Sequence, residues 1–115
     1  MDGKLDKGKI KTADPSLALI VGSLVKAFNP ERVYLFGSYA RGEAGPDSDY
    51  DLMLIMPDDA PSRLLDPRTA CQVLGGTGIA ADVLLWRRST FERRRHLRAS
   101  LPATIEAEGK ILYAA

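Results

Sequence analysis

The sequence predicts an α/β fold in which a small mixed β-sheet of three to four strands packs with helices. Amphipathic helical segments alternate with short apolar strand segments, and no repeat or linker interrupts this order. The length of 115 residues allows one compact domain. A composition of 45% hydrophobic and 27% charged residues is typical of globular proteins and argues against disordered or fibrous classes. The net charge of +1 argues against a general nucleic-acid binder.

The N-terminal part of the chain divides at residue 12. Lysines, aspartates and glycines dominate residues 1–12, so we expect a flexible charged tail there and a single domain over residues 13–115. Asp14 then provides an N-cap and Pro15 fits the first position of a helix. Apolar residues at helical spacing predict one buried face of that helix: Leu17, Ile20, Val21, Leu24 and Phe28.

Two strands follow this helix. The apolar run 32–36 is rich in β-forming residues and ends at Gly37. The run 50–56 is apolar at every position after Asp51. Apolar side chains therefore point to both faces of the strand, and we expect both faces to be covered.

The C-terminal half predicts one more strand and three helical segments. Residues 61–74 have a helical pattern that Pro67 interrupts, and residues 79–86 predict the third strand. Ser89 and Glu92 fit a capping box at the start of a helix that reaches about residue 98. A short helix over 100–108, closed by a glycine, and an extended segment over 110–113 complete the domain.

The sequence also indicates the cellular setting. Cys71 is the only cysteine and lies among apolar residues, which suits a buried thiol in a reducing compartment. No apolar run approaches the roughly 20 residues that span a bilayer. The first eleven residues lack the apolar segment of a secretion signal. We therefore expect a cytoplasmic protein without membrane contact.

A pair of aspartates opens the second strand. Asp49 and Asp51 are two residues apart, and carboxylates at this spacing on a strand project from the same face. Two adjacent anions repel each other unless a cation neutralises them, and hard oxygen ligands suit a Mg²⁺ ion that also binds phosphate oxygens. The alternative is that this Asp-x-Asp only caps a turn, which is a common use of the pattern.

The turn after the first strand has the residues of an anion site. Gly37 allows the backbone to approach a phosphate closely, and Ser38 adds a hydroxyl donor. Arg41 lies three residues later, on the same helical face as Ser38, and can reach an oxygen of a triphosphate. The alternative is a capped turn between two antiparallel strands, with Arg41 in solvent.

Strand direction links these motifs to a third acid. The short connection between the first two strands makes them antiparallel and brings both motifs to one edge of the sheet. The next connection holds a helix, as a parallel crossover requires, so the third strand starts at that same edge, where Asp82 lies. An exposed strand end is the alternative interpretation of Asp82.

Residues 35–42 and 48–52 together resemble a motif of the DNA polymerase beta-like nucleotidyltransferase superfamily: Gly-Ser, ten residues, then Asp-x-Asp. The small size is similar to that of its minimal nucleotidyltransferases. The resemblance implies a Mg²⁺-dependent enzyme that transfers AMP from ATP to an acceptor hydroxyl and releases pyrophosphate. By position, Asp49 and Asp51 would bind two Mg²⁺ ions, and Asp82 would hold one and help to deprotonate the acceptor. Gly37 and Ser38 would bind the terminal phosphates.

The same resemblance suggests a partner. Minimal nucleotidyltransferases are often encoded beside an all-helical HEPN-type ribonuclease toxin, and some neutralise the toxin by attaching AMP to a tyrosine. We therefore expect an antitoxin of a toxin–antitoxin pair that acts by AMPylation. Two alternatives stay open: a non-catalytic antitoxin that acts by occlusion, and an aminoglycoside-type adenylyltransferase with a small-molecule acceptor. The sequence leaves the oligomeric state open.

Six arginines lie around Trp86 and Phe91: Arg87, Arg88, Arg93, Arg94, Arg95 and Arg98. A solvated helix face explains such a cluster, and docking to an acidic partner or to RNA phosphates is the alternative. The isolated Trp86 favours packing over base stacking, because no further exposed aromatic residues accompany it.

Overall fold

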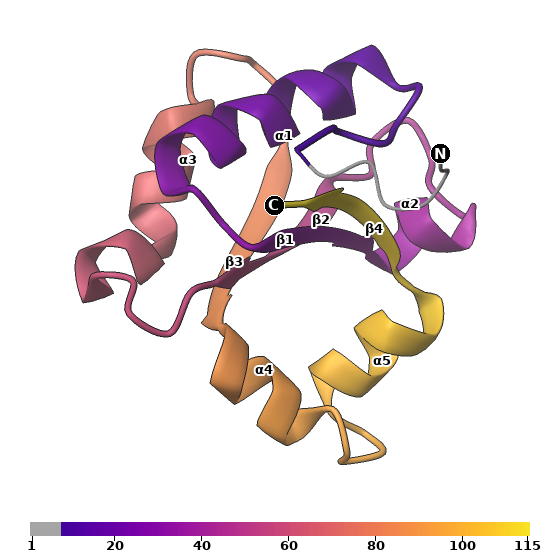
Figure 1. Cartoon of the computed structure of the whole chain (residues 1–115). Coiled ribbons are helices and arrows are strands. Elements are labelled where there is room, and N and C mark those ends of the chain that lie inside the picture. The colour runs from indigo at the N-terminus through magenta and orange to yellow at the C-terminus, as the bar shows by residue number, and fades with distance from the viewer. Residues whose placement is uncertain (1–7) are drawn as a thin grey trace, which may run out of the picture.

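A computed structural model describes residues 8–115 as a four-stranded mixed sheet with helices on both faces (Figure 1). The strands lie in the order β3-β2-β1-β4, with β1 antiparallel to β2 and β4, and β2 parallel to β3. The α/β prediction is therefore confirmed. The elements are α1 (Pro15–Phe28), β1 (Arg32–Phe36), α2 (Gly37–Arg41), β2 (Tyr50–Met56), a 3-10 turn (Ser62–Leu65), α3 (Pro67–Leu74), β3 (Ala81–Arg87), α4 (Arg88–Arg94), α5 (Leu101–Glu108) and β4 (Lys110–Ala114).

Helix α1 forms where the sequence predicts it. The Asp14 side chain accepts hydrogen bonds from the backbone N–H groups of Ser16 and Leu17, at 3.0 and 3.3 Å. Asn29 ends the helix in a left-handed conformation, with φ of 52°. All five apolar residues of the predicted face are buried. The cap, the proline and the spacing of apolar residues are local signals, and together they determine this helix.

The two faces of the sheet are covered unequally. Helices α1 and α3 lie on one face, and α4 and α5 lie on the other (Figure 1). The α1 side holds the larger apolar cluster, to which Leu52 and Leu54 of β2 contribute. The α4 side holds a smaller cluster with Met53 and Ile55 of the same strand. Strand β2 is thus covered on both faces, as predicted.

The predicted helix over 61–74 is two elements. Pro67 begins α3, where a missing N–H is tolerated, and Asp66 caps it by accepting from the N–H of Arg68 at 2.9 Å. The predicted burial of Cys71 is wrong. Ala70 and Leu74 form the buried face of α3, and the next residue after Ala70 points about 100° away from it, so Cys71 is exposed.

The capping box at Ser89 is also wrong. Helix α4 begins at Arg88 and ends at Arg94, several residues before the predicted end. The N–H of Ser89 donates to the Asp58 carboxylate at 2.9 Å, so this helix start is capped by a side chain 31 residues away. A distant cap of this kind leaves no local pattern in the sequence.

The chain before α1 lies against the sheet as far as the structure describes it. Gly8 N–H donates to the carbonyl of Ala114 at 2.8 Å, and Lys11 N–H donates to that of Leu112 at 2.7 Å. Ile10 packs against the larger apolar cluster. Residues 8–11 therefore differ from the flexible segment predicted there, and residues 1–7 of the predicted tail lie outside the described residues. None of the helices described here has the length and apolar character needed to span a bilayer.

Candidate active site

The predicted motifs meet at one edge of the sheet. Phe36, the last residue of β1, pairs with Asp51 in the antiparallel register. Asp51 in turn pairs with Asp82 in the parallel register of β2 and β3. The strand directions predicted from the connection lengths are confirmed, and they bring the turn at Gly37 and two of the three acids to the same edge.

Gly37 lies so close to Asp51 that a side chain at this position would displace the Asp51 carboxylate. Its φ of 75° lies in the left-handed region, and a Cβ placed there would overlap the Asp51 carboxylate and lie 3.0 Å from its Cγ. Glycine avoids both the backbone strain and the overlap. This contact seats the N-terminus of α2 directly against the acidic edge.

Asp51 has an electrostatic environment that disfavours its charge. Burial raises the pKa of its carboxyl group above the ordinary value, and the negative charges of Asp82 and Asp49 raise it further. Arg41 acts in the opposite direction, with the smallest effect of these groups. A carboxylate in this position gains stability when a cation binds beside it.

A pocket of about 460 Å³ opens beside the paired acids. Asp51 and Asp82 line it together with Phe36, Leu84 and Cys71. Its volume lies within the range of small-ligand sites, roughly 300 to 1,000 Å³. The sequence did not indicate Phe36, Leu84 or Cys71 as lining residues. Alternation along β3 could have indicated Leu84, because it lies two residues after Asp82 on the same face.

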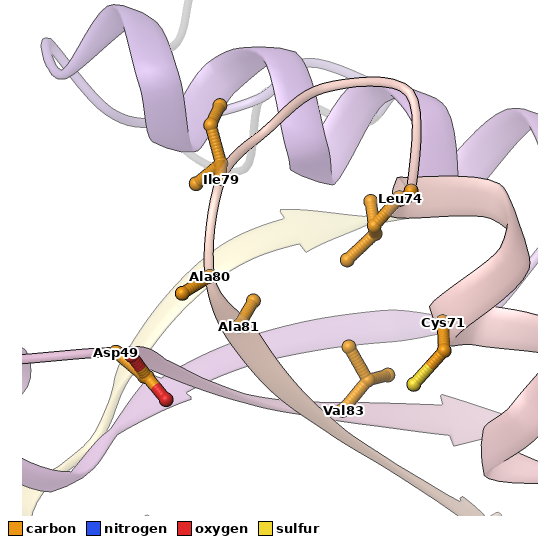
Figure 2. Close-up of a pocket in the computed structure, with 8 residues that line it drawn as sticks. Asp49, Cys71, Leu74, Ile79, Ala80, Ala81 and Val83 are labelled. Atoms are coloured by element: carbon orange, nitrogen blue, oxygen red, sulfur yellow. The ribbon is translucent and has the colours of Figure 1, made fainter.

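Asp49 lies one residue before β2 and lines a different pocket, of about 260 Å³. Figure 2 shows its carboxylate at one end of that pocket and Cys71 of α3 at the other. Within residues 8–115, no three His, Cys, Asp or Glu side chains are placed to hold a metal ion. The predicted convergence of all three aspartates stays a prediction, and Asp49 is near enough to raise the pKa of Asp51.

Ser38 and Arg41 both lie on α2, as predicted. Arg41 contacts other residues through its side chain, and Ser38 does so through its backbone carbonyl. Arg41 forms ion pairs with Glu43 at 2.9 Å and with Glu108 at 3.8 Å, and about two fifths of its side chain is exposed. These exposed pairs contribute little to stability, so the guanidinium group can exchange them for another anion. Ser38 is the second residue of α2, and its carbonyl accepts from Glu43 N–H at 2.9 Å.

A tyrosine between the two motif aspartates anchors the edge to α1. The Tyr50 hydroxyl donates to the Asp14 carboxylate at 2.6 Å, and the Tyr50 ring stacks on Tyr39 of α2 at 4.2 Å between centroids. The hydrogen bond to Asp14 raises the pKa of Tyr50 strongly. Sequence reasoning predicted Asp14 only as a cap. Its second role, 36 residues away along the chain, left no signal.

The acidic pair fits a hard divalent cation as an open site. Asp51 and Asp82 lie opposite each other, and the pKa of Asp51 is raised by burial and by repulsion from neighbouring acids, a repulsion that a cation would relieve. Mg²⁺ commonly takes one or two protein carboxylates and fills its other positions with water and phosphate oxygens. The donor set therefore fits a nucleotide-bound ion better than an ion enclosed by protein.

The fold and this edge define a small α/β domain whose glycine turn packs against an acidic pair. The nucleotidyltransferase domain family matches residues 16–109. The chain therefore belongs to the nucleotidyltransferase domain family. No curated protein matches the chain.

Two solved structures are similar to the chain. One is a toxin–antitoxin with AMP-PNP, at 22% identity and a TM-score of 0.46, covering 84% of this chain and 73% of that one. The other is a proposed nucleotidyltransferase from Sulfolobus solfataricus, at 21% identity and a TM-score of 0.48, covering 68% of this chain and 69% of that one.

Proposed function

We propose that the chain is a Mg²⁺-dependent nucleotidyltransferase that transfers AMP from ATP to a hydroxyl group of a partner protein. The observation that carries the proposal is the pairing of Asp51 with Asp82 across β2 and β3, with Gly37 packed against Asp51. Membership of the nucleotidyltransferase domain family supports the reaction class. The acceptor we propose is a tyrosine of an all-helical HEPN-type toxin, which makes this chain an antitoxin.

Each predicted residue has a proposed task. Gly37 and Ser38, at the start of α2, bind the terminal phosphates, and Arg41 binds a phosphate oxygen after leaving Glu43. Asp49 and Asp51 bind the cations, for which Asp49 turns from its own pocket toward Asp51. The ions, when bound, neutralise charge on the phosphates.

Asp82 is exposed and reachable by a large acceptor. In the proposed reaction Asp82 takes the proton of the acceptor hydroxyl. The acceptor oxygen forms a bond to the α-phosphorus as the bond from that phosphorus to the pyrophosphate oxygen breaks, and pyrophosphate leaves. The exposure of Asp82 distinguishes it from Asp51, which is partly buried.

Transfer is tested by the intact mass of the partner. The HEPN-type protein is incubated with ATP, Mg²⁺ and either the wild type or Asp49→Ala plus Asp51→Ala. We expect an increase of one or more AMP groups with the wild type and a rate lower by about 10²-fold or more with the variant, because metal ligation supplies several kcal/mol to such reactions. Asp47→Ala, an exposed aspartate in the same loop, is the matched control and should leave the rate unchanged.

One observation favours a second candidate function. The apolar pocket beside the connection from α4 to α5, with Trp86 and Leu97 in its lining, suits an antitoxin that acts by occlusion. Equal neutralisation of the partner by wild type and double variant, without any mass increase, would establish that alternative. A small-molecule acceptor would give a mass increase on an aminoglycoside instead of on the protein.

A further inference from the structure

A third pocket, a groove between β3 and the connection from α4 to α5, lies away from the acidic edge. Its volume is about 410 Å³, and its lining is mainly apolar, with Trp86, Leu97, Leu101 and Pro102. Leu97 has 59% of its surface exposed, the largest fraction among the large apolar residues that the structure describes. An exposed leucine beside a partly exposed tryptophan is a usual component of a protein-binding surface.

Exposed positive charge lies at one side of this groove, where Arg94 lines it. Arg93, Arg94 and Arg98 are exposed and form no ion pair with any described residue. The neighbouring arginines are different: Arg88 pairs with Glu31 at 2.6 Å, and Arg95 pairs with Glu106 at 3.1 Å. Arg94 in the lining, Arg98 between the lining residues Leu97 and Ala99, and Arg93 next to Arg94 in the sequence are therefore left available for acidic groups of a partner.

The groove shares a face of β3 with the acidic edge. Asp82, Leu84 and Trp86 are every second residue of this strand and therefore lie on the same face. At about 3.3 Å per residue, the four positions from Asp82 to Trp86 span roughly 13 Å. A protein segment seated in the groove can thus extend along β3 and place a side chain at Asp82.

We infer that this groove, between Trp86 and Leu101, docks an acidic segment of the acceptor protein through a large apolar side chain. The apolar side chain would enter beside Trp86 and Leu97, and its acidic neighbours would pair with Arg93 and Arg98. This inference rests on the proposed function for its purpose, which is to deliver the acceptor hydroxyl. The binding itself does not depend on nucleotide or catalysis.

The geometry favours a protein over RNA. The guanidinium carbon of Arg94 lies 5.7 Å from the centroid of the Trp86 ring, so one face of the indole is already covered by a cation. Phe91, the aromatic residue of α4, is buried. A stacking platform for bases needs exposed aromatic faces, and this groove presents an apolar slot instead.

The groove contains its own reporter, since Trp86 is the only tryptophan in the chain. The probes are synthetic 15-residue peptides rich in glutamate with one central phenylalanine or leucine, and matched peptides with glycine in the central position. A lysine-rich peptide with phenylalanine and an oligouridine RNA complete the set. Binding is followed by the emission of Trp86 at low and high salt.

We expect the anchored acidic peptides to shift the emission of Trp86, and the glycine-centred and lysine-rich peptides to leave it unchanged. Arg93→Glu plus Arg98→Glu should weaken binding by about tenfold or more, as should a rise in salt, because both remove charge attraction. Arg63→Glu, an exposed arginine on the 3-10 turn, is the matched control and should bind like the wild type. Circular dichroism checks that the variants fold.

Three results would overturn the inference: no emission change with any anchored acidic peptide, affinity unaffected by the double charge reversal, or a response to oligouridine alone. The inference and the proposed function fail separately. If Asp49→Ala plus Asp51→Ala binds the peptides normally and no partner gains mass with the wild type, docking stands and catalysis does not.

Discussion

Two partly exposed carboxylates, Asp14 and Asp51, lie near the start of β2 and have opposite environments. Asp14 accepts a hydrogen bond from Tyr50 and two from the first turn of α1, and these bonds lower its pKa. Asp51 is partly desolvated and lies near the charges of two other acids, and both effects raise its pKa. The same residue type is thus stabilised as an anion at one position and destabilised at the other.

The contrast indicates which acid maintains the fold and which is available for chemistry. Asp14 satisfies donors that would otherwise be unpaired, so its charge strengthens the folded state. The charge of Asp51 weakens the folded state, and this cost is expected only where a cation or substrate compensates for it. Partners, and not residue type, determine the two roles.

The largest change in the free energy of unfolding should come from a substitution in the turn that contacts Asp51. We expect Gly37→Ala to lower the free energy of unfolding by about 2–3 kcal/mol, through left-handed backbone strain and overlap with the Asp51 carboxylate. Gly42→Ala is the matched control, since its φ of 74° is similar but a Cβ there meets open space. It should lose only about 1 kcal/mol.

Urea unfolding gives the free energy of unfolding of both variants. The two values are compared only if the slope of that free energy against urea concentration is the same in both. The excess loss in Gly37→Ala reports the contact with Asp51. Equal losses in the two variants would mean that the Asp51 side chain moves aside at no cost, and the contact with Gly37 would then not constrain the acidic edge.

A smaller effect should follow from removing the hydroxyl that holds Asp14. We expect Tyr50→Phe to lose about 1–2 kcal/mol at pH 7, because the hydrogen bond is to a charged group. A carboxylate with a lowered pKa contributes stability above its unfolded pKa of about 3.9 and loses it as the pH falls through the folded value. The difference from wild type should therefore shrink below about pH 4.

Thermal unfolding between pH 3 and pH 7 checks this expectation. Tyr113→Phe, at a buried tyrosine of β4, is the control and should show a change that does not vary with pH. A loss in Tyr50→Phe that is constant with pH would mean that the hydroxyl does not interact with the charged form of Asp14.

Local signals predicted most of the fold. The bounds of β1 and β2 coincide with the predicted runs, because turn residues delimit each run in sequence. The start of β3 was predicted two residues too early, since it is fixed by pairing of Ala81 with Tyr50. The Asp58 cap of α4 and the Tyr50 bond to Asp14 join residues more than 30 positions apart, which periodicity cannot register.

The candidate site was predictable to the extent that topology determines it. Connection lengths fix strand direction, and direction places Asp82 beside Asp51. The orientation of Asp49 was not predictable in this way, because it lies just outside β2, where alternation of side chains along a strand no longer applies. Its place at the site stays a prediction, which Asp49→Ala alone in the transfer experiment would test.

The smallest change in the free energy of unfolding should be a gain, in contrast to the losses expected for Gly37→Ala and Tyr50→Phe. We expect Asp51→Asn to raise the free energy of unfolding by about 0.5–1 kcal/mol at pH 7, a usual gain when a strained functional site is relaxed. A carboxyl group with a raised pKa contributes stability below its unfolded pKa and loses it as the pH rises through the folded value, so the gain should vanish below about pH 4. Mg²⁺ with ATP should stabilise the wild type and not the variant, whereas Asp47→Asn should change neither quantity. Destabilisation by Asp51→Asn at neutral pH would mean that this carboxylate supports the fold as Asp14 does, and the acidic pair would then lose its physical argument for binding a cation.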